Sequence, residues 1–298
     1  MRLGDEDRSS NFEDRTGRSG MGFGGGGGMG GGMMPALFGL VLSRFGIVGV
    51  VILLLGYCAL TTLGGGGGTT GGTPALETGQ PGAQKSTLDP ATQDMVLRVL
   101  GSTERRWTDL FRAQGQQYQP TTLVFYSRMD RSGCGVAQAA MGPFYCPTDQ
   151  RIYLDTTFFD ELHNRFGAAG DFAQAYVIAH EVGHHIQHLT GVLDQARQAQ
   201  SSSSSSEGNA VQVRVELQAD CYAGVWAAND RNLLEPGDVE EGMRAAEAIG
   251  DDTLQSQTQG RVVPESFTHG TSAQRMAWLR RGLQSGDPAA CDTFNQAV

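Results

Sequence analysis

The stretch that most constrains the fold is His-Glu-x-x-His at residues 180–184. It follows a run, 172–179, that favours a helix, with Asp171 as the candidate N-cap. On a helix, residues i and i+4 share one face, so His180 and His184 can both bind one zinc ion at about 2.0–2.1 Å. Glu181 lies beside that face and is the candidate general base. An ordinary polar helix surface produces the same short pattern by chance, so a third ligand must come from elsewhere in the fold.

A second predicted helix, Asn209–Ala228, offers that ligand in Glu216-Leu-Gln-Ala-Asp220. Glu216 and Asp220 are four residues apart and share a face. We expect Glu216 to bind the metal and Asp220 to accept the outward N–H of His180, which fixes the tautomer of that ring. The alternative is an exposed acidic helix face without a metal. His188 cannot replace Glu216, because the row from His180 to His188 spans about 12 Å at 1.5 Å per residue.

The net charge of the chain argues against nucleic acid as its partner. The 298 residues carry a net charge of −10, and every one of the 22 basic residues except Lys85 is an arginine. This balance excludes the basic footprint that is typical of nucleic-acid-binding proteins. None of the five cysteines forms a C-x-x-C pair, so a cysteine-based zinc site is not indicated.

The composition changes several times before residue 86. Residues 1–34 are predicted to be a disordered, glycine-rich tail, since 21–34 are nearly all glycine and methionine. Residues 35–63 are predicted to form one transmembrane helix, because 45–63 carry no charge and about 20 apolar residues cross a bilayer. Residues 64–85 are rich in Gly, Thr and Pro and are predicted to be a flexible linker. A cleaved signal peptide and a buried core helix are the competing interpretations of 35–63.

Basic residues predict the orientation of that span. Five arginines precede it, whereas Lys85 is the one basic residue shortly after it. The positive-inside rule then places the N-terminus in the cytoplasm and residues 86–298 in the periplasm or outside the cell. The expected location is the inner (cell) membrane, crossed once.

Residues 86–298 are predicted to be one α+β domain, with strands early and helices late. Gln200–Gly208, with six consecutive serines, is predicted to be a mobile loop. The strands are expected to form a small antiparallel sheet, and the one at Gly135–Ala140 could bind an extended peptide by β-addition. The predicted strands are 121–126, 135–140 and 151–155, and the further predicted helices are 89–113, 156–166, 238–249 and 272–283.

Several stretches together give the chain a family resemblance. It resembles the bacterial neutral zinc metallopeptidases, the YpfJ-like membrane-anchored proteins. The resemblance implies a gluzincin-type metallopeptidase with a zincin-like domain that uses Zn²⁺, and it implies no known substrate. The matching stretches are Cys134-Gly135, Gly142-Pro-Phe-Tyr-Cys-Pro147, Ile152-Tyr-Leu-Asp155, Ala179-His-Glu-Val-Gly-His-His-Ile-Gln187, Glu216-Leu-Gln-Ala-Asp-Cys-Tyr-Ala-Gly224 and Phe267-Thr-His-Gly-Thr-Ser272.

The expected function is zinc-dependent endopeptidase activity on a peptide or protein substrate, with Glu181 as general base. His269 is the candidate hydrogen-bond donor to the oxyanion, and Arg275 is a second candidate. A capping role at the entry of the following helix is the alternative for His269. The alternative for the whole chain is a membrane-tethered binding module that keeps a structural zinc without catalysis.

Four cysteines lie in the predicted external domain, where an oxidising environment favours disulfides. Four cysteines allow three pairings. Cys134 and Cys146 flank a predicted hairpin, so we expect these two to pair, which leaves Cys221 to pair with Cys291. Four buried reduced thiols are the alternative. Cys58 falls in the predicted span and is expected to remain unpaired.

Overall fold

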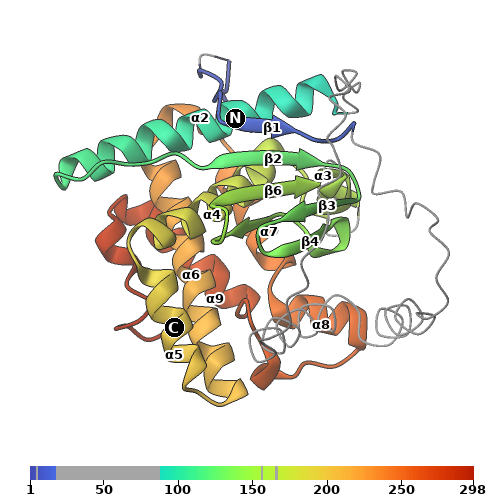
Figure 1. Cartoon of the computed structure of the whole chain (residues 1–298), viewed down its shortest axis with the longest axis vertical. Helices are drawn as coiled ribbons and strands as arrows, with labels where there is room; N and C mark the ends of the chain where they lie inside the picture. Colours follow the sequence, from blue (N-terminus) through green and yellow to red (C-terminus); the bar gives the residue numbers. More distant parts are fainter. Residues whose placement is uncertain (5, 18–87, 156, 165–166) are drawn as a thin grey trace, which may run out of the picture. The chain divides into compact units, whose positions relative to one another are not determined.

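The computed structural model describes residues 1–4, 6–17, 88–155, 157–164 and 167–298. These residues include a four-stranded sheet in the order β1-β2-β6-β5. A separate two-stranded hairpin consists of β3 and β4 (Figure 1). The strands are β1 Phe12–Asp14, β2 Thr122–Tyr126, β3 Met129–Ser132, β4 Gly135–Gln138, β5 Phe144–Cys146 and β6 Arg151–Asp155.

The prediction of an antiparallel sheet is wrong. Within the four-stranded sheet of the described residues, β1 pairs with β2 in parallel and β2 pairs with β6 in parallel, whereas β5 pairs with β6 in the antiparallel sense. The β3–β4 hairpin is antiparallel but is not part of this sheet. The reason lies in β2, which is buried on both faces as strands of parallel sheets are. Leu123 and Phe125 pack into the main core among the helices, whereas Val124 and Tyr126 pack into a second, small core with Tyr153. The fold class is nevertheless α+β, mostly helical with a small sheet.

The helices carry most of the described chain. Each predicted helix of the domain is present within a few residues of its expected bounds, and α5 and α8 were not predicted. Asp89 caps α2, with Pro90 at its first position. The helices are α2 Pro90–Ala113, α3 Phe158–Asn164, α4 Asp171–Leu189, α5 Val192–Ser201, α6 Ser205–Asn229, α7 Asp238–Ala248, α8 Asp251–Gln259 and α9 Ser272–Ser285.

Two local predictions were wrong. The loop predicted for 200–208 is confined to residues 202–204, because α5 extends to Ser201 and α6 begins at Ser205. Ser204 forms a capping box with Glu207, which stabilises the start of α6. Asp171 does not cap α4 either, since the N-cap is Gly170 and Asp171 is the first helical residue.

Glycines let α6 and α9 approach each other closely. A Cβ on Gly224 would overlap the carbonyl of Leu279, and one on Gly282 would overlap the carbonyl of Cys221. Any larger side chain at either position would therefore push α9 away from α6. This contact fixes where Arg275, on α9, meets the second half of α6.

The N-terminal segment, Met1–Thr16, forms one compact unit with Thr87–Val298, so the prediction of disorder is wrong for the described residues up to 17. Figure 1 shows β1 in blue alongside β2, at the edge of the sheet. The backbone N–H of Ser9 donates to the carbonyl of Leu97 at 2.9 Å. Charged side chains of the segment have partners in the domain: Arg15 contacts Asp130 at 3.0 Å, and Arg151 contacts Glu13 at 2.7 Å.

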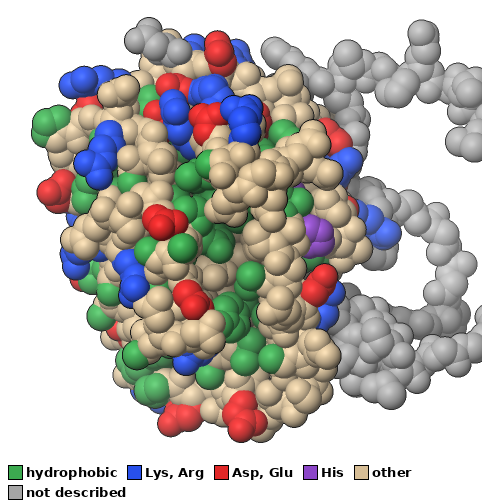
Figure 2. Space-filling view, turned by 90° about the vertical axis from the view of Figure 1, so that its left-hand side faces the viewer, with side chains coloured by type: hydrophobic (Ala, Val, Ile, Leu, Met, Phe, Trp, Pro, Cys, Tyr) green, Lys and Arg blue, Asp and Glu red, His purple; other side chains and the backbone are tan. Residues whose placement is uncertain are grey.

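Residues 18–34, the predicted span at 35–63 and the predicted linker at 64–85 lie outside the described residues. Among the described residues, no helix is long and apolar enough to cross a bilayer. On the face shown in Figure 2, Lys and Arg side chains are interspersed with Asp and Glu, so this face carries no continuous basic surface.

Candidate metal centre

The three predicted ligands come together between α4 and α6. Nε2 of His180 lies 3.1 Å from Oε2 of Glu216, and Nε2 of His184 lies 3.5 Å from the same oxygen. One donor atom from each residue falls within 4.8 Å of the other two. Gly183 makes this possible, since a Cβ there would lie 3.0 Å from both Cα and the carbonyl oxygen of Ala219. Glycine inside the motif thus permits the close helix contact that brings Glu216 to the histidines.

Each ligand is held by one polar neighbour. Nδ1 of His180 lies 2.8 Å from Asp220, as predicted for that carboxylate. Nδ1 of His184 lies 2.8 Å from Oε1 of Gln187. Gln212 donates to Oε1 of Glu216 at 2.9 Å. Such partners orient metal ligands, and in both histidines they leave Nε2 directed at the shared site. The two glutamines were missed, although each lies within one helical turn of its ligand.

Asp220 is fully buried and receives four hydrogen-bond contacts. Besides His180, these come from the hydroxyl of Tyr176 at 2.6 Å and from Nε and Nη2 of Arg275, each at 2.9 Å. Arg275 also donates to the carbonyl of Ile249 at 3.3 Å. All three guanidinium nitrogens of Arg275 form hydrogen bonds within the protein, and its side chain is only 2% exposed. This geometry argues against Arg275 as a hydrogen-bond donor to substrate.

These contacts set the protonation of the metal-free site. Burial disfavours the charged form of His180, but the neighbouring Asp220 and Glu216 outweigh burial and raise its pKa to about 10. Burial likewise opposes ionisation of Asp220, yet the charges of Arg275 and His180 lower its pKa. A metal ion must therefore displace a proton from His180 when it binds.

Glu181 lies beside the ligands, on the same helix. Its side chain is nearly buried, and among the described residues Oε2 has no hydrogen-bond partner. An unpartnered buried carboxylate oxygen is costly, so its presence next to a metal site calls for a functional reason. This is the position that the sequence predicted for the general base.

The loop that carries His269 is anchored by Asp251. The carboxylate of Asp251 accepts the backbone N–H groups of Thr268 and His269, both at 2.6 Å, and of Gly270 at 3.1 Å. Nδ1 of His269 lies 3.3 Å from the same carboxylate. Burial lowers the pKa of His269, but Asp251 and the nearby Glu216 outweigh it and raise that pKa. His269 thus lies close enough to Glu216 to feel its charge, although it is not part of the ligand cluster.

The remaining histidines of α4 are not ligands. Nδ1 of His185 lies 3.1 Å from the hydroxyl of Tyr145, and its Nε2 lies 2.6 Å from the carbonyl of Gln119. Burial lowers the pKa of His185 to about 4, so this ring is neutral near pH 7. Among the described residues, Nδ1 of His188 is buried without a partner, and His188 is not in the cluster.

Both predicted disulfides are present, Cys134–Cys146 and Cys221–Cys291. The second one joins the segment after α9 to α6, directly beside Asp220. It therefore fastens the C-terminal residues to the helix that carries Glu216, the third candidate ligand.

The donor set fits zinc. Two imidazole nitrogens and one carboxylate oxygen, all converging from two helices, are the ligands of one class of catalytic zinc site, which leaves a fourth position for water or substrate. The ordered partners behind both rings are also what such a site requires.

Comparison with known proteins agrees with this geometry. The family described as "Putative neutral zinc metallopeptidase" matches residues 1–294. The chain belongs to this family. An uncharacterized protein, YpfJ of Escherichia coli K12, is 45% identical over 307 residues and is covered completely, as is this chain. An uncharacterized protein of Mycobacterium tuberculosis H37Rv, Rv2575, is 43% identical over 218 residues, which cover 69% of this chain and 71% of the relative. No solved structure matches, so the zincin-like fold implied by the resemblance stays a prediction.

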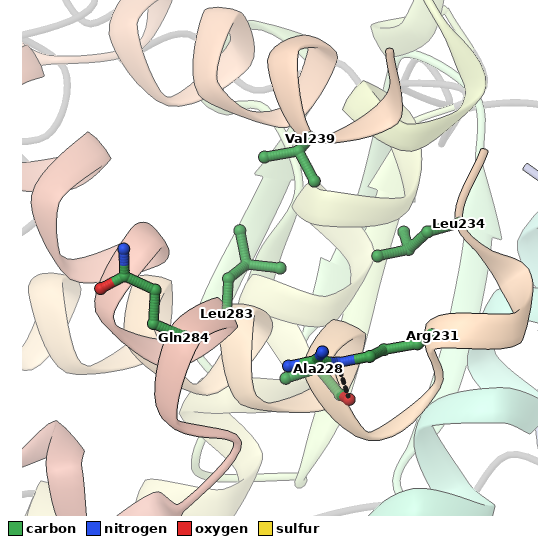
Figure 3. Close-up of a pocket in the computed structure, with 6 residues that line it drawn as sticks. All are labelled: Ala228, Arg231, Leu234, Val239, Leu283 and Gln284. Atoms are coloured by element: carbon green, nitrogen blue, oxygen red, sulfur yellow. Dashed lines mark hydrogen bonds between the residues drawn. The ribbon is translucent and has the colours of Figure 1, made fainter. Parts of the chain in front are cut away.

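A surface pocket of about 540 Å³ has none of the candidate ligands in its lining, and its lining residues are drawn in Figure 3. It is formed by the end of α6, the short helix η2 Arg231–Leu233, α7 and α9. Its lining includes no acidic residue and no histidine, so it is not the reaction site. The lining residues are Ala228, Arg231, Leu234, Val239, Leu283 and Gln284.

Proposed function

We propose that the chain is a zinc-dependent endopeptidase that hydrolyses peptide bonds in a peptide or protein substrate. The single observation that carries this proposal is the unpartnered Oε2 of Glu181 beside three converging ligands. A structural zinc site has no need of such a base, because its metal binds no reacting water.

Each residue of the site has a separate role in the proposed reaction. His180, His184 and Glu216 would hold zinc, which would supply a nucleophile at neutral pH by lowering the pKa of water toward about 7. Glu181 takes a proton at Oε2 from the attacking water and passes it to the nitrogen of the leaving amine. His269, held by Asp251, donates a hydrogen bond to the oxygen that gains charge. Its raised pKa favours the protonated, donating form.

The substrate is expected to lie extended near the metal. The β3–β4 hairpin is a separate two-stranded sheet and exposes Met129 and Val136, which are 50% and 40% exposed. An extended peptide that adds to this hairpin gains backbone hydrogen bonds and apolar contacts.

The second candidate is a binding module with a structural zinc. One experiment separates the two. Full-length protein and its Glu181→Gln variant are assayed on casein and on a peptide library, with and without chelator, and zinc is measured by elemental analysis. We expect the wild type to cleave and the variant to keep zinc without cleaving. The matched control, Glu240→Gln, changes an exposed glutamate of α7 and should cleave normally. Zinc in the wild type without any hydrolysis favours the binding module.

A further inference from the structure

We propose that Gln187 is a positioning residue for the metal ligand His184, held in turn by Gln218 and the carbonyl of Cys291. This proposal rests on the proposed metal site. It adds a residue to which neither the family match nor the motif assigns a role.

The hydrogen bonds form a chain with one consistent direction. Nδ1 of His184 donates to Oε1 of Gln187 at 2.8 Å. Nε2 of Gln187 donates to Oε1 of Gln218 at 3.0 Å and to the carbonyl of Val215 at 2.7 Å. Nε2 of Gln218 donates to the carbonyl of Cys291 at 3.0 Å. The oxygen and the nitrogen of each of the two amides thus have at least one complementary partner.

Burial lets this series of hydrogen bonds fix the orientation and tautomer of His184. Gln187 is fully buried and Gln218 is 5% exposed, so neither amide can exchange its partner for bulk water. Because Oε1 of Gln187 can only accept, Nδ1 of His184 must carry the proton, and Nε2 keeps its lone pair for the metal. Asp220 has the same effect on His180. The disulfide of Cys291 with Cys221, the neighbour of Asp220, links the supports of both histidines.

The test measures zinc affinity rather than activity. Metal-free full-length protein is titrated with zinc in competition with a chromogenic chelator, for the wild type, Gln187→Met and Gln218→Met. Methionine keeps the length of the side chain but can neither accept from His184 nor donate to Val215. The matched control is Gln174→Met, which places the same change on α4 at a side chain that forms no hydrogen bond with the other described residues.

We expect Gln187→Met to weaken zinc binding about 10–100-fold, Gln218→Met by less, and Gln174→Met not at all. Folding of each metal-free variant is checked by circular dichroism. If Gln187→Met does not fold, Gln187→Asn is used in its place, because its shorter side chain cannot reach His184. A folded Gln187→Met protein that binds zinc as tightly as the wild type overturns the positioning role. If the wild type itself binds no zinc, the proposed function fails instead, so the two failures are distinguishable.

We also infer, from an independent observation, that the N-terminal segment and the metal domain occupy the same side of any membrane. β1 pairs with β2 through three consecutive residues, Phe12 to Asp14, whereas the apolar stretch 45–63 lies between these two strands in sequence. Strands can pair only within one compartment. A single crossing between them is therefore incompatible with this sheet.

Further contacts hold the same segment. Nη1 of Arg98 lies 3.2 Å from the carbonyls of both Leu3 and Gly4, and Arg151 contacts Glu13 at 2.7 Å. Gly101 leaves room for the segment, since a Cβ there would overlap the carbonyl of Asp7. Because the domain holds two disulfides, the shared side is the oxidising one, outside the cytoplasm. This inference replaces the predicted cytoplasmic N-terminus.

The test compares two matched insertions in full-length protein. The cleavage sequence of a specific protease is inserted either in the glycine run 24–28 or in the glycine run 64–68, on opposite sides of the apolar stretch. The protease is added outside spheroplasts or expressed inside them, and permeabilised cells confirm that both sites can be cut. Cleavage of both sites from the same side supports the inference. Cleavage of the first only from inside and the second only from outside overturns it.

Discussion

Removal of the Arg275 guanidinium should destabilise the protein strongly, because Asp220 would remain buried with half of its hydrogen bonds. Arg275→Met keeps much of the apolar volume but removes two of the four contacts that Asp220 receives. Breaking a buried charge pair by removing one partner costs about 3–5 kcal/mol. We expect a value near the lower end, about 3 kcal/mol, because Tyr176 and His180 continue to hydrogen-bond to Asp220.

The assay is denaturant unfolding of metal-free protein, followed by circular dichroism. The control is Arg280→Met, an exposed arginine on the same helix, which should change the free energy of unfolding by less than about 0.5 kcal/mol. The double variant Arg275→Met with Asp220→Asn removes both charges, so its loss should be smaller than the sum of the two single losses by about 1–2 kcal/mol. Equal losses for Arg275→Met and Arg280→Met, or strict additivity with Asp220→Asn, would refute the reasoning.

Three further predictions concern the two carboxylates of the site on α6, the pKa of His180 and the contact of the N-terminal segment with Gly101. Glu216→Ala should lose the metal, which elemental analysis measures, and stoichiometric zinc in this variant would place the ligand elsewhere. Asp220→Asn should weaken zinc binding about 10–100-fold, which chelator competition measures. The pKa of His180, raised to about 10, means that its proton is bound below that pH and must leave when zinc binds. Zinc affinity should therefore rise by about tenfold per pH unit between pH 7 and 9, with about one proton released per zinc at pH 8 in a pH-indicator titration, and unchanged affinity over that range would contradict the shift. Gly101→Ala should destabilise the protein and expose residues 1–16 to limited proteolysis, since its Cβ meets Asp7, whereas Gly208→Ala, in open space on α6, should be neutral or stabilising.

The convergence of the candidate ligands could be predicted from the sequence because the geometry that brings them together is almost entirely helical. His180 and His184 are one turn apart on α4, and Gln212, Glu216 and Asp220 follow one another at four-residue intervals on α6. Once two such rows face each other, the donor atoms converge. What spacing does not show is how close the helices come, and that depends on Gly183 against Ala219.

Parts of the fold that depend on distant pairing could not be predicted in the same way. β1 is three residues long, lies in a polar segment of mixed charge and precedes a glycine-rich stretch, so the local composition favours disorder. Its partner β2 begins more than a hundred residues later, and sequence periodicity carries no information about such a pairing. The same reason explains the wrong sheet direction, since alternation and length distinguish a strand but not whether its neighbour runs parallel.

The different roles of Glu216 and Asp220 follow from what lies behind each carboxylate. Both are buried on one face of α6, four residues apart, so helical position alone does not separate a ligand from a supporting residue. Asp220 faces Arg275 and Tyr176, which occupy both of its oxygens and hold it against Nδ1 of His180. Glu216 has Gln212 on Oε1, while Oε2 faces Nε2 of both histidines. The residue whose second oxygen meets two imidazole nitrogens and no other donor is the one available to a metal, and on α6 that residue is Glu216.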